Sequence, residues 1–366
     1  MNPDRTRVVV AMSGGVDSSA AAGLLVQQGY EVIGVMMRLW TEDDGCGGRH
    51  NRCCTPDQMA DARRVADRLG IPFYVVDMRE TFKARVVDPF IDAYAAGLTP
   101  NPCLNCNRHI RFGALLRQAM AMDADYLATG HYARIWQAED GAYQLLKGVD
   151  PAKDQSYVLS VMTQEQLARV RFPVGDYTKA EIRRMAEALG LHTARKPESQ
   201  DLCFLADGDY RGFLERRAPG VARPGPIVNR RGERLGTHTG LPHYTVGQRK
   251  GLGVSAPEPL YVLGADMATN TLIVGAAEEL GRSALTAHQV NWIAGAPPPG
   301  PVRAEVKIRY RAREVPADVT PVDATTACVT FDTPVRDITP GQGAVFYQGE
   351  VCLGGGVIAP DAFARD

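Results

Sequence analysis

Hydrophobic and polar positions follow two different patterns along this chain, and the change falls near residue 210. Before it, short apolar runs typical of buried strands lie between longer stretches with helical spacing. The runs that predict strands are Val8–Ala11, Val32–Met37, Phe73–Asp77 and Tyr126–Thr129. The stretches that predict helices are Ser18–Gln28, Asp57–Leu69 and Arg108–Met122. Strands that alternate with helices predict an α/β fold, a doubly wound parallel sheet covered on both faces.

Beyond residue 210 the helical spacing fades, and short β-type runs alternate with Gly and Pro. The segments that predict strands there are Ile227–Asn229, Tyr261–Leu263, Thr271–Val274, Val302–Tyr310, Ala327–Phe331 and Ala344–Tyr347. We therefore expect an α/β domain over residues 1–209 and a small central β domain over 210–284. A C-terminal β domain, barrel-like, is expected over 285–366.

Composition narrows the classes of function. The 366 residues exceed one ordinary domain, and 41 Lys and Arg nearly balance 42 Asp and Glu. This balance argues against a wholly electrostatic nucleic-acid binder but allows a local basic face. No apolar run is long enough to span a membrane, and Val8–Ala11 is too short for a signal-peptide core. We expect a cytoplasmic protein whose thiols are kept reduced.

The segment Ser13–Ser19, with sequence SGGVDSS, lies between the first predicted strand and the first predicted helix. Its glycines allow a tight turn, and amide groups at the start of the helix then face an anion. The serines add hydroxyl donors, and Asp17 is placed to hold Mg²⁺ against phosphates. This is not the Walker pattern, because no Lys follows the second glycine. A plain strand–helix turn is the alternative interpretation.

The cysteines are clustered, which in a reducing compartment indicates catalysis or metal binding. Cys103 and Cys106 form a C-x-x-C in a Pro- and Asn-rich loop. Cys106 falls at the start of a predicted helix, where the helix dipole lowers the pKa of a thiol. Cys203 supplies a further thiol, although a small buried apolar role fits it equally.

A second group, Cys46, Cys53 and Cys54, shares a loop with His50 at loose zinc-like spacing. No fourth partner is well placed, so a surface loop with inert thiols is the favoured interpretation.

The Ser13–Ser19 segment resembles the loop of the PP-loop ATP pyrophosphatases, whose members cleave ATP between the α- and β-phosphates and adenylate an oxygen. Over essentially its whole length the chain resembles the bacterial tRNA-specific 2-thiouridylase (MnmA/TrmU) family. The matching pieces are Ala11–Ser18, Gly34–Met37, Asn101-Pro102, Cys106-Asn107, Phe112-Gly113, Thr129–Ala133, Lys153–Tyr157, Cys203-Phe204, Gly247–Arg249, Arg309–Arg311 and Pro340–Gln342.

This resemblance implies ATP-dependent 2-thiolation of the wobble uridine of tRNA, with Cys106 as catalytic thiol and Cys203 as persulfide carrier. A disulfide between them is the implied intermediate. The implied ATP site is Ala11, Met12, Ser13, Gly14, Gly15, Val16, Asp17, Ser18, Met37 and Gly130. Asn101, Pro102 and Cys103 correspond to the segment that contacts the target base. The implied tRNA contacts are His131, Lys153, Asp154, Gln155, Arg309, Tyr310 and Gln342.

The chemistry of the residues agrees with several of these roles. Lys153 and Arg309 suit phosphates, and Tyr310 suits stacking on an extruded base. An ordinary solvated strand at Arg309-Tyr310, a satisfied surface histidine at His131 and a core methionine at Met37 are the alternatives. The expected cofactors are ATP with Mg²⁺ and persulfide sulfur from a donor protein, either a cysteine desulfurase or a relay protein. The other expected partner is tRNA.

One position departs from the family pattern, because many members carry Asp where this chain has Cys103. Cys103, Cys106 and Cys203 would supply three thiolates, enough for an iron–sulfur cluster with one open iron. We favour the persulfide route. Two other functions stay open: a PP-loop amide synthetase, which would need no catalytic cysteines, and an RNA-binding module with a vestigial nucleotide loop.

Overall fold

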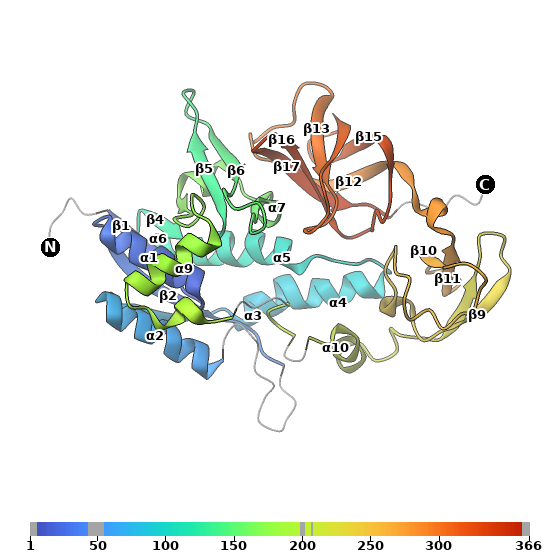
Figure 1. The fold of residues 1–366 in the computed structure, drawn as a ribbon, viewed down its shortest axis with the longest axis horizontal. Coiled ribbons are helices and arrows are strands. Elements are labelled where there is room, and N and C mark those ends of the chain that lie inside the picture. The colour runs from blue at the N-terminus through green and yellow to red at the C-terminus, as the bar shows by residue number, and fades with distance from the viewer. Residues whose placement is uncertain (1–5, 43–54, 198–201, 206–207, 361–366) are drawn as a thin grey trace.

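The computed structural model describes residues 6–42, 55–197, 202–205 and 208–360 (Figure 1). Cys46, Cys53 and Cys54 lie outside these ranges, so the prediction of inert thiols there stays a prediction. Across the described ranges, no helix is long and apolar enough to cross a membrane.

The N-terminal part holds the parallel sheet that the hydrophobic pattern predicts. Its strand order is β3-β2-β1-β4-β7, and every neighbouring pair is parallel. The strands are β1 (Arg7–Ala11), β2 (Glu31–Arg38), β3 (Phe73–Asp77), β4 (Tyr126–Ala128) and β7 (Val170–Arg171). Side chains of the central strand alternate between two cores, with Val9 in one and Val8 and Val10 in the other. The predicted α/β fold class is confirmed.

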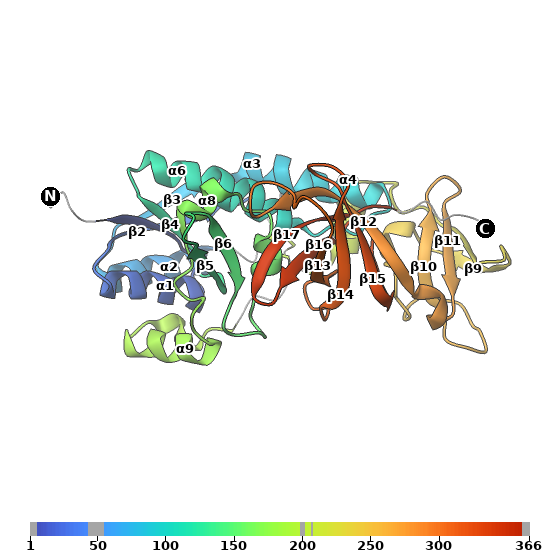
Figure 2. The same ribbon diagram turned by 90° about the horizontal axis from the view of Figure 1, so that it is seen from above.

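Helices cover both faces of this sheet (Figure 2). One face packs on α1 (Val16–Gln27), α2 (Pro56–Leu69) and α9 (Lys179–Ala188). The other face packs on α3 (Arg79–Phe82), η1 (Lys83–Val87), α4 (Asp88–Ala95), η2 (Cys106–Leu115) and α6 (Leu116–Ala121). Helix α2 begins at a capping box formed by Thr55 and ends at Gly70, which has the left-handed conformation. These two residues are the start and stop signals of the helix in the sequence.

The prediction for the helix that carries Cys106 was wrong at its start. The helix begins at Pro102 as α5 (Pro102–Asn105) and continues without a break into η2, which has π-helical hydrogen bonding. Asn101 caps it by accepting a hydrogen bond from the Cys103 amide at 3.1 Å. The helix start therefore lies at Pro102, and Cys106 lies one turn inside.

The C-terminal part is a closed barrel of six antiparallel strands, because β12 pairs with both β15 and β17. The strands are β12 (Arg282–Trp292), β13 (Val302–Lys307), β14 (Val315–Pro321), β15 (Ala327–Val335), β16 (Gly343–Gln348) and β17 (Val351–Ile358). The predicted strand Val302–Tyr310 ends earlier, at Lys307, so Arg309 and Tyr310 lie in the following turn.

A hairpin from the N-terminal part extends the barrel sheet. Strands β5 (Ala133–Gln137) and β6 (Tyr143–Lys147) pair with each other, and β6 pairs with the first half of β17 (Figure 1). One eight-stranded sheet thus contains residues from both ends of the chain. The predicted domain boundaries at residues 209 and 284 stay a prediction. This sheet shows that strands from the predicted first domain and the predicted last domain pair with each other.

Between them lies a small sheet of order β10-β11-β8-β9. Its strands are β8 (Gly225–Val228), β9 (Arg234–His238), β10 (Tyr261–Asp266) and β11 (Thr271–Gly275). The remaining helical segments are α7 (Ser156–Leu159), α8 (Gln164–Ala168), α10 (Tyr210–Arg217) and 3₁₀ turns at His192–Arg195, Leu241–His243 and Ala277–Leu280.

Candidate active site

The loop between β1 and α1 is shaped by two glycines. Gly14 has a φ of +69°, and a Cβ there would lie 2.4 Å from the Gln58 carbonyl oxygen. Gly15 is the N-cap of α1, and no side chain caps that end of the helix. The first-turn amides therefore keep their orientation toward a ligand, as an anion site requires.

Serine side chains brace this loop from within. The Ser18 hydroxyl accepts a hydrogen bond from the Ser13 amide at 3.2 Å and donates one to the Gly15 carbonyl at 3.2 Å. The Ser19 hydroxyl also donates to the Gly15 carbonyl, at 2.8 Å. These three hydrogen bonds hold the loop in its turn.

Two lysines reach this loop from distant parts of the sequence. The Lys179 ammonium lies 2.8 Å from both carboxylate oxygens of Asp17, and the Tyr132 hydroxyl donates to one of them at 2.7 Å. The Lys196 ammonium donates to the Gly14 carbonyl at 3.0 Å and to Asp61 at 2.6 Å. Asp17, predicted to hold Mg²⁺, therefore forms an ion pair with Lys179 in this structure.

Asp61 anchors the second lysine. Burial alone would raise the pKa of its carboxyl, but hydrogen bonds from Lys196, Arg64 and His192 outweigh burial and lower the pKa to about 2. The carboxylate is therefore charged at neutral pH and fixes Lys196 beside the loop.

The other predicted ATP residues lie at the same edge of the sheet, where the parallel strands end. Gly130 follows β4, and a Cβ on it would lie 2.7 Å from the Ser18 amide nitrogen. Met37, half-buried, lies near the end of β2. A hollow of about 600 Å³ opens beside the ends of β2 and β3, lined by Trp40, Asp77 and Arg79 among others. This edge is where open α/β sheets bind ligands.

The two predicted catalytic cysteines pack into one apolar cluster. Cys106 is 3% exposed and belongs to the cluster that also contains Phe82 and Phe204. Cys203 is half-buried and packs against the same cluster. Phe204, next to Cys203, is fully buried and packs edge-on against Phe82 and Phe90. Cys103, by contrast, is exposed.

The loop before Cys103 is clasped by the barrel. The Thr99 amide donates to the Pro340 carbonyl at 2.9 Å, and the Gln342 side-chain amide donates to the Thr99 carbonyl at 2.7 Å. Gly341, at φ +91°, leaves room for this contact, since a Cβ there would lie 2.9 Å from the Thr99 nitrogen. Gln342, predicted to contact tRNA, thus makes a contact within the chain.

Several other predicted tRNA contacts are also engaged within the chain. Asp154 is buried and accepts hydrogen bonds from Gly148 and Ser156. The Gln155 side chain accepts from the Tyr132 amide at 3.0 Å. One Arg309 nitrogen donates to the Val246 and Asp337 carbonyls and to the Thr339 hydroxyl.

His131, predicted to contact tRNA, does not fit the alternative interpretation of a surface histidine, because it is 7% exposed. Its Nδ1 lies 2.7 Å from the Thr129 hydroxyl, and its ring packs against Phe112 and Phe172. Burial lowers the pKa of His131 well below its usual range, helped by the nearby Arg111, so the ring is neutral. In this conformation it offers almost no surface to tRNA.

The segment near the clasped loop keeps one exposed aromatic ring. Tyr310 is 38% exposed, and its ring centroid lies 6.2 Å from that of Tyr157. Burial raises the pKa of the Tyr310 hydroxyl and Asp154 raises it further, whereas Lys153 and Arg311 lower it. Tyr157, whose ring lies beside that of Tyr310, also has a side-chain hydrogen bond with Asn101, so Tyr310 lies near the Asn101–Cys103 segment.

Sequence comparison covers the chain in three consecutive matches. Residues 6–207 match the tRNA methyl transferase HUP domain family, 211–276 the tRNA methyl transferase PRC-barrel domain family, and 282–358 the aminomethyltransferase beta-barrel domain family. The chain is 52% identical over 352 residues to the tRNA-specific 2-thiouridylase MnmA of Magnetococcus marinus, covering 96% of this chain and 98% of that protein. The chain belongs to the tRNA-specific 2-thiouridylase family.

A second member, the tRNA-specific 2-thiouridylase MnmA of Moorella thermoacetica, is 51% identical over 351 residues, covering 96% of this chain and 98% of that protein. Among solved structures, the U34-tRNA thiolase NcsA of Methanococcus maripaludis with its [4Fe-4S] cluster covers 59% of this chain and 67% of its own. Its sequence identity is 21% and its TM-score 0.34, a likeness too weak to bear on the chemistry of this family member.

The suggested iron–sulfur ligand set does not fit this arrangement. Within the described ranges, no group of three or more His, Cys, Asp or Glu side chains is placed to hold a metal ion. We therefore derive no step through a cluster.

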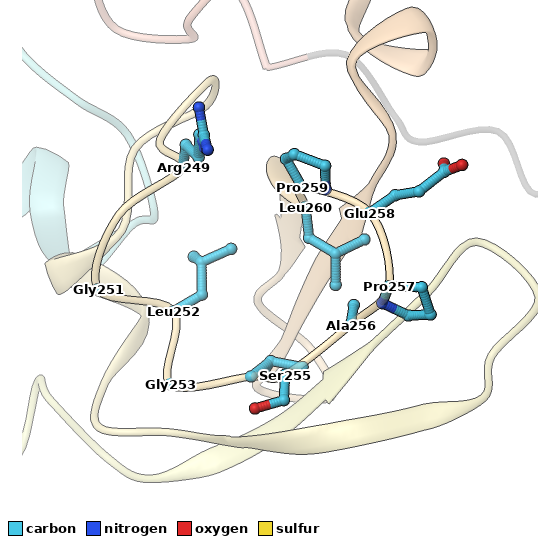
Figure 3. A pocket seen from close by; sticks show the side chains of 11 residues that line it. Arg249, Gly251, Leu252, Gly253, Ser255, Ala256, Pro257, Glu258, Pro259 and Leu260 are labelled. Atoms are coloured by element: carbon cyan, nitrogen blue, oxygen red, sulfur yellow. The ribbon is translucent and has the colours of Figure 1, made fainter.

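A separate hollow of about 510 Å³ lies in the central domain, between the segments 249–253 and 254–260 (Figure 3). Leu252 belongs to the core of that domain and Leu260 packs against it, while the Glu258 carboxylate points outward. This hollow contains none of the predicted site residues and lies far from the β1–α1 loop (Figure 1).

Sequence reasoning missed Lys179, Lys196 and Asp61. One signal for Lys179 was present: Thr178 and Glu181 form a capping box, which places Lys179 at the first position of α9. A cation at that position opposes the helix dipole, so it needs a compensating anion nearby. The sequence carries no such local signal for Lys196 or Asp61.

Proposed function

We propose that this enzyme uses ATP to replace the C2 oxygen of the wobble uridine of tRNA by sulfur. The observation that carries the proposal is that Cys106 and Cys203, almost a hundred residues apart in sequence, pack at one apolar cluster in a member of the 2-thiouridylase family. The loop at Gly14 and Gly15, where the N-terminus of α1 has no side-chain cap, supports the other part of the proposal, which is the binding of the ATP phosphates.

In the first step the uridine O2 attacks the α-phosphorus of ATP. The bond from that phosphorus to the bridging oxygen breaks, and pyrophosphate leaves with the electron pair. The first-turn amides of α1, which no side chain caps, bind the departing phosphates in this proposal, and the hydroxyls of Ser13 and Ser18, 3.2 Å apart, hold the turn that presents those amides. The adenylated O2 becomes a leaving group.

In the second step sulfur replaces it. The Cys106 thiolate attacks the Cys203 sulfur of a Cys203 persulfide and forms a disulfide, and the terminal sulfur leaves as hydrosulfide. Hydrosulfide attacks C2 of the uridine, the C2–O bond breaks, and AMP leaves. Two cysteines are oxidised by two electrons while the sulfane sulfur is reduced, so a cellular thiol reductant must restore the enzyme.

The proposal includes Mg²⁺ with ATP, tRNA as substrate, and a cysteine desulfurase or relay protein that loads Cys203. The exposed Tyr310 ring lies beside Tyr157, which has a side-chain hydrogen bond with Asn101, and this supports a site for the target base there. Because the chemistry needs reduced thiols and tRNA, we place the enzyme in the cytoplasm.

The test is restoration of 2-thiouridine in a deletion strain, read by mass spectrometry of tRNA nucleosides. We expect Cys106→Ala and Cys203→Ala each to abolish the modification while the purified variants still bind ATP. Cys328→Ala, a half-buried cysteine on β15 outside the site, is the matched control and should restore it. Normal 2-thiouridine with Cys203→Ala would contradict the persulfide role, and absence of tRNA-dependent pyrophosphate release would contradict adenylation.

A further inference from the structure

Glu42, four residues beyond the end of β2, is buried although it carries a carboxylate. It is 5% exposed, and glutamate is among the residues least often buried unless it is paired. Two arginines of α10 reach this carboxylate. Arg216 donates from Nε to Oε1 at 2.9 Å and from Nη2 to Oε2 at 3.0 Å, and the Arg217 Nε lies 3.4 Å from Oε1. A two-bond ion pair therefore ties α10 to the segment that follows β2.

Helix α10 begins seven residues after Cys203 and packs on the same apolar cluster. Figure 1 shows this helix on the far side of α4 from the barrel. Phe213 of α10 is fully buried, and its ring centroid lies 5.6 Å from that of Phe204, the neighbour of Cys203. Phe213 also packs edge-on against Trp40 at 6.2 Å, and the Arg217 guanidinium lies 4.9 Å from the Trp40 ring centroid. A continuous line of contacts thus leads from the arginines of α10 to the neighbour of Cys203.

The two kinds of contact that hold α10 fix different things. Packing of the Phe213 and Phe204 rings supplies apolar burial, which has little directionality. A two-bond arginine–carboxylate pair requires a defined plane and distance, so it sets the rotation and the lengthwise position of the helix. Arg216 lies three residues after Phe213, on the same face of α10. A rotation of α10 would therefore move the Phe213 ring, and a displaced Phe204 would carry Cys203 away from the cluster that contains Cys106.

We propose that the ion pair between Glu42 and Arg216 positions Cys203 for sulfur transfer. The pair fixes α10, and the aromatic rings between α10 and Cys203 transmit that position, so that the persulfide carrier stays beside Cys106. This inference rests on the proposed roles of the two cysteines and adds what holds them together. Glu42 and Arg216 are positioning residues in this proposal, because neither charged group touches the reacting sulfur atoms.

The test measures how closely the two thiols are held, without ATP or tRNA. Purified, reduced enzyme is equilibrated with mixtures of reduced and oxidised glutathione, and mass spectrometry of its peptides gives the fraction that carries a Cys106–Cys203 disulfide. Two protein thiols pass two electrons and two protons to one oxidised glutathione, which becomes two reduced glutathione molecules. The equilibrium constant is the effective concentration of one thiol at the other. We expect Arg216→Met to lower it about tenfold or more, because two charge-assisted hydrogen bonds are lost.

A second measurement separates positioning from a general loss of structure. Release of pyrophosphate from ATP upon addition of tRNA reports adenylation, which uses neither cysteine in the proposed mechanism. Arg216→Met should keep this rate within about twofold, while single-turnover formation of 2-thiouridine slows about tenfold. Arg216→Lys keeps the charge but loses the two-bond geometry, so it should recover part of the effective concentration.

Arg7→Met is the matched control. Arg7 forms a partly buried ion pair with Glu31 at 2.9 Å between the starts of β1 and β2, at the edge of the sheet opposite the β1–α1 loop. This variant should leave the effective concentration and both rates unchanged. Arg216→Met also leaves the buried Glu42 without its two-bond partner, so a double variant with Glu42→Gln, which removes both charges, guards against misfolding. It should lower the effective concentration as much as the single variant.

An unchanged effective concentration in both the single and the double variant would overturn the proposal. Equal slowing of pyrophosphate release and of 2-thiouridine formation would overturn it as well, because the ion pair would then have a general structural role. Failure of the unmodified enzyme to form the Cys106–Cys203 disulfide in any glutathione mixture would instead contradict the proposed function, so the failures are distinct.

Discussion

At the scale of the residue, Gly14 decides whether the nucleotide loop can form. Its positive φ disfavours any side chain, and the Gln58 carbonyl occupies the place of a Cβ. Ser13 and Ser18 brace the turn from the other side, so the backbone has little room to relax. The backbone conformation and the close approach of Gln58 therefore require glycine at position 14.

We therefore expect Gly14→Ala to weaken ATP binding by about tenfold or more, because the added methyl must push the loop away from α2. Titration calorimetry with ATP measures this. Gly29→Ala is the matched control: its φ is +86°, but a Cβ there would meet nothing within 4 Å. That variant should lose about 1–2 kcal/mol of stability from backbone strain yet bind ATP normally. Equal ATP affinities for both variants would show that the loop tolerates the displacement.

At the scale of the element, the loop 339–342 of the barrel positions the helix that carries Cys103 and Cys106. It holds Thr99 through both the amide and the carbonyl, and the Tyr157 hydroxyl donates to the Gly343 carbonyl at 3.0 Å. The barrel thus contacts the segment before the predicted catalytic Cys106 directly.

This contact predicts that Gln342→Ala lowers kcat for thiolation about two- to tenfold at saturating tRNA, the effect of one lost hydrogen bond on loop position. Steady-state kinetics with varied tRNA measures it. Gln348→Ala, which removes a comparable side-chain bond to the Arg303 carbonyl elsewhere in the barrel, should change neither parameter. A raised KM for tRNA with unchanged kcat would instead support the predicted tRNA contact at Gln342.

Local signals account for the elements that the sequence predicts well. The apolar run at Val8–Ala11 and the Gly70 stop after α2 depend on neighbouring residues alone, and both are confirmed. The start of the Cys106 helix was misplaced because a stretch rich in Pro and Asn predicts a loop, although Pro also favours the first position of a helix, which Pro102 occupies. The π-helical hydrogen bonding of η2 has no periodic signature in its polar pattern.

The site was predictable where one segment carries it, as at Ser13–Ser19. It was not predictable where remote segments meet, as in the pairing of Lys179 with Asp17 or of Thr99 with Gln342. The burial of His131 likewise depends on Phe172, forty-one residues away in sequence. Such contacts follow from the three-dimensional packing, which periodicity and composition do not determine.

At the scale of the whole molecule, one apolar core joins the parallel sheet to the barrel. The cluster that holds Cys106 also contains Ile293, Val345 and Tyr347 of the barrel. Asn291 on β12 donates to the Ser160 and Met162 carbonyls at 2.8 Å each, and β6 pairs with β17. The barrel also has a core of its own, around Val306 and Phe346, and the central sheet has a smaller one around Ile227 and Val262.

These connections predict that the parallel sheet and the barrel unfold as one cooperative unit, while the central sheet opens at lower free energy. Hydrogen exchange of the intact enzyme, followed by mass spectrometry at increasing urea, measures this. Amides of β1 and β16 should exchange with free energies within about 1 kcal/mol of each other, and those of β10 and β11 with a smaller value. Asn291→Ala should lower the protection of β1 and β16 together, because its side chain ties the two parts. A variant that loosened β16 alone would show that the barrel folds independently of the catalytic sheet.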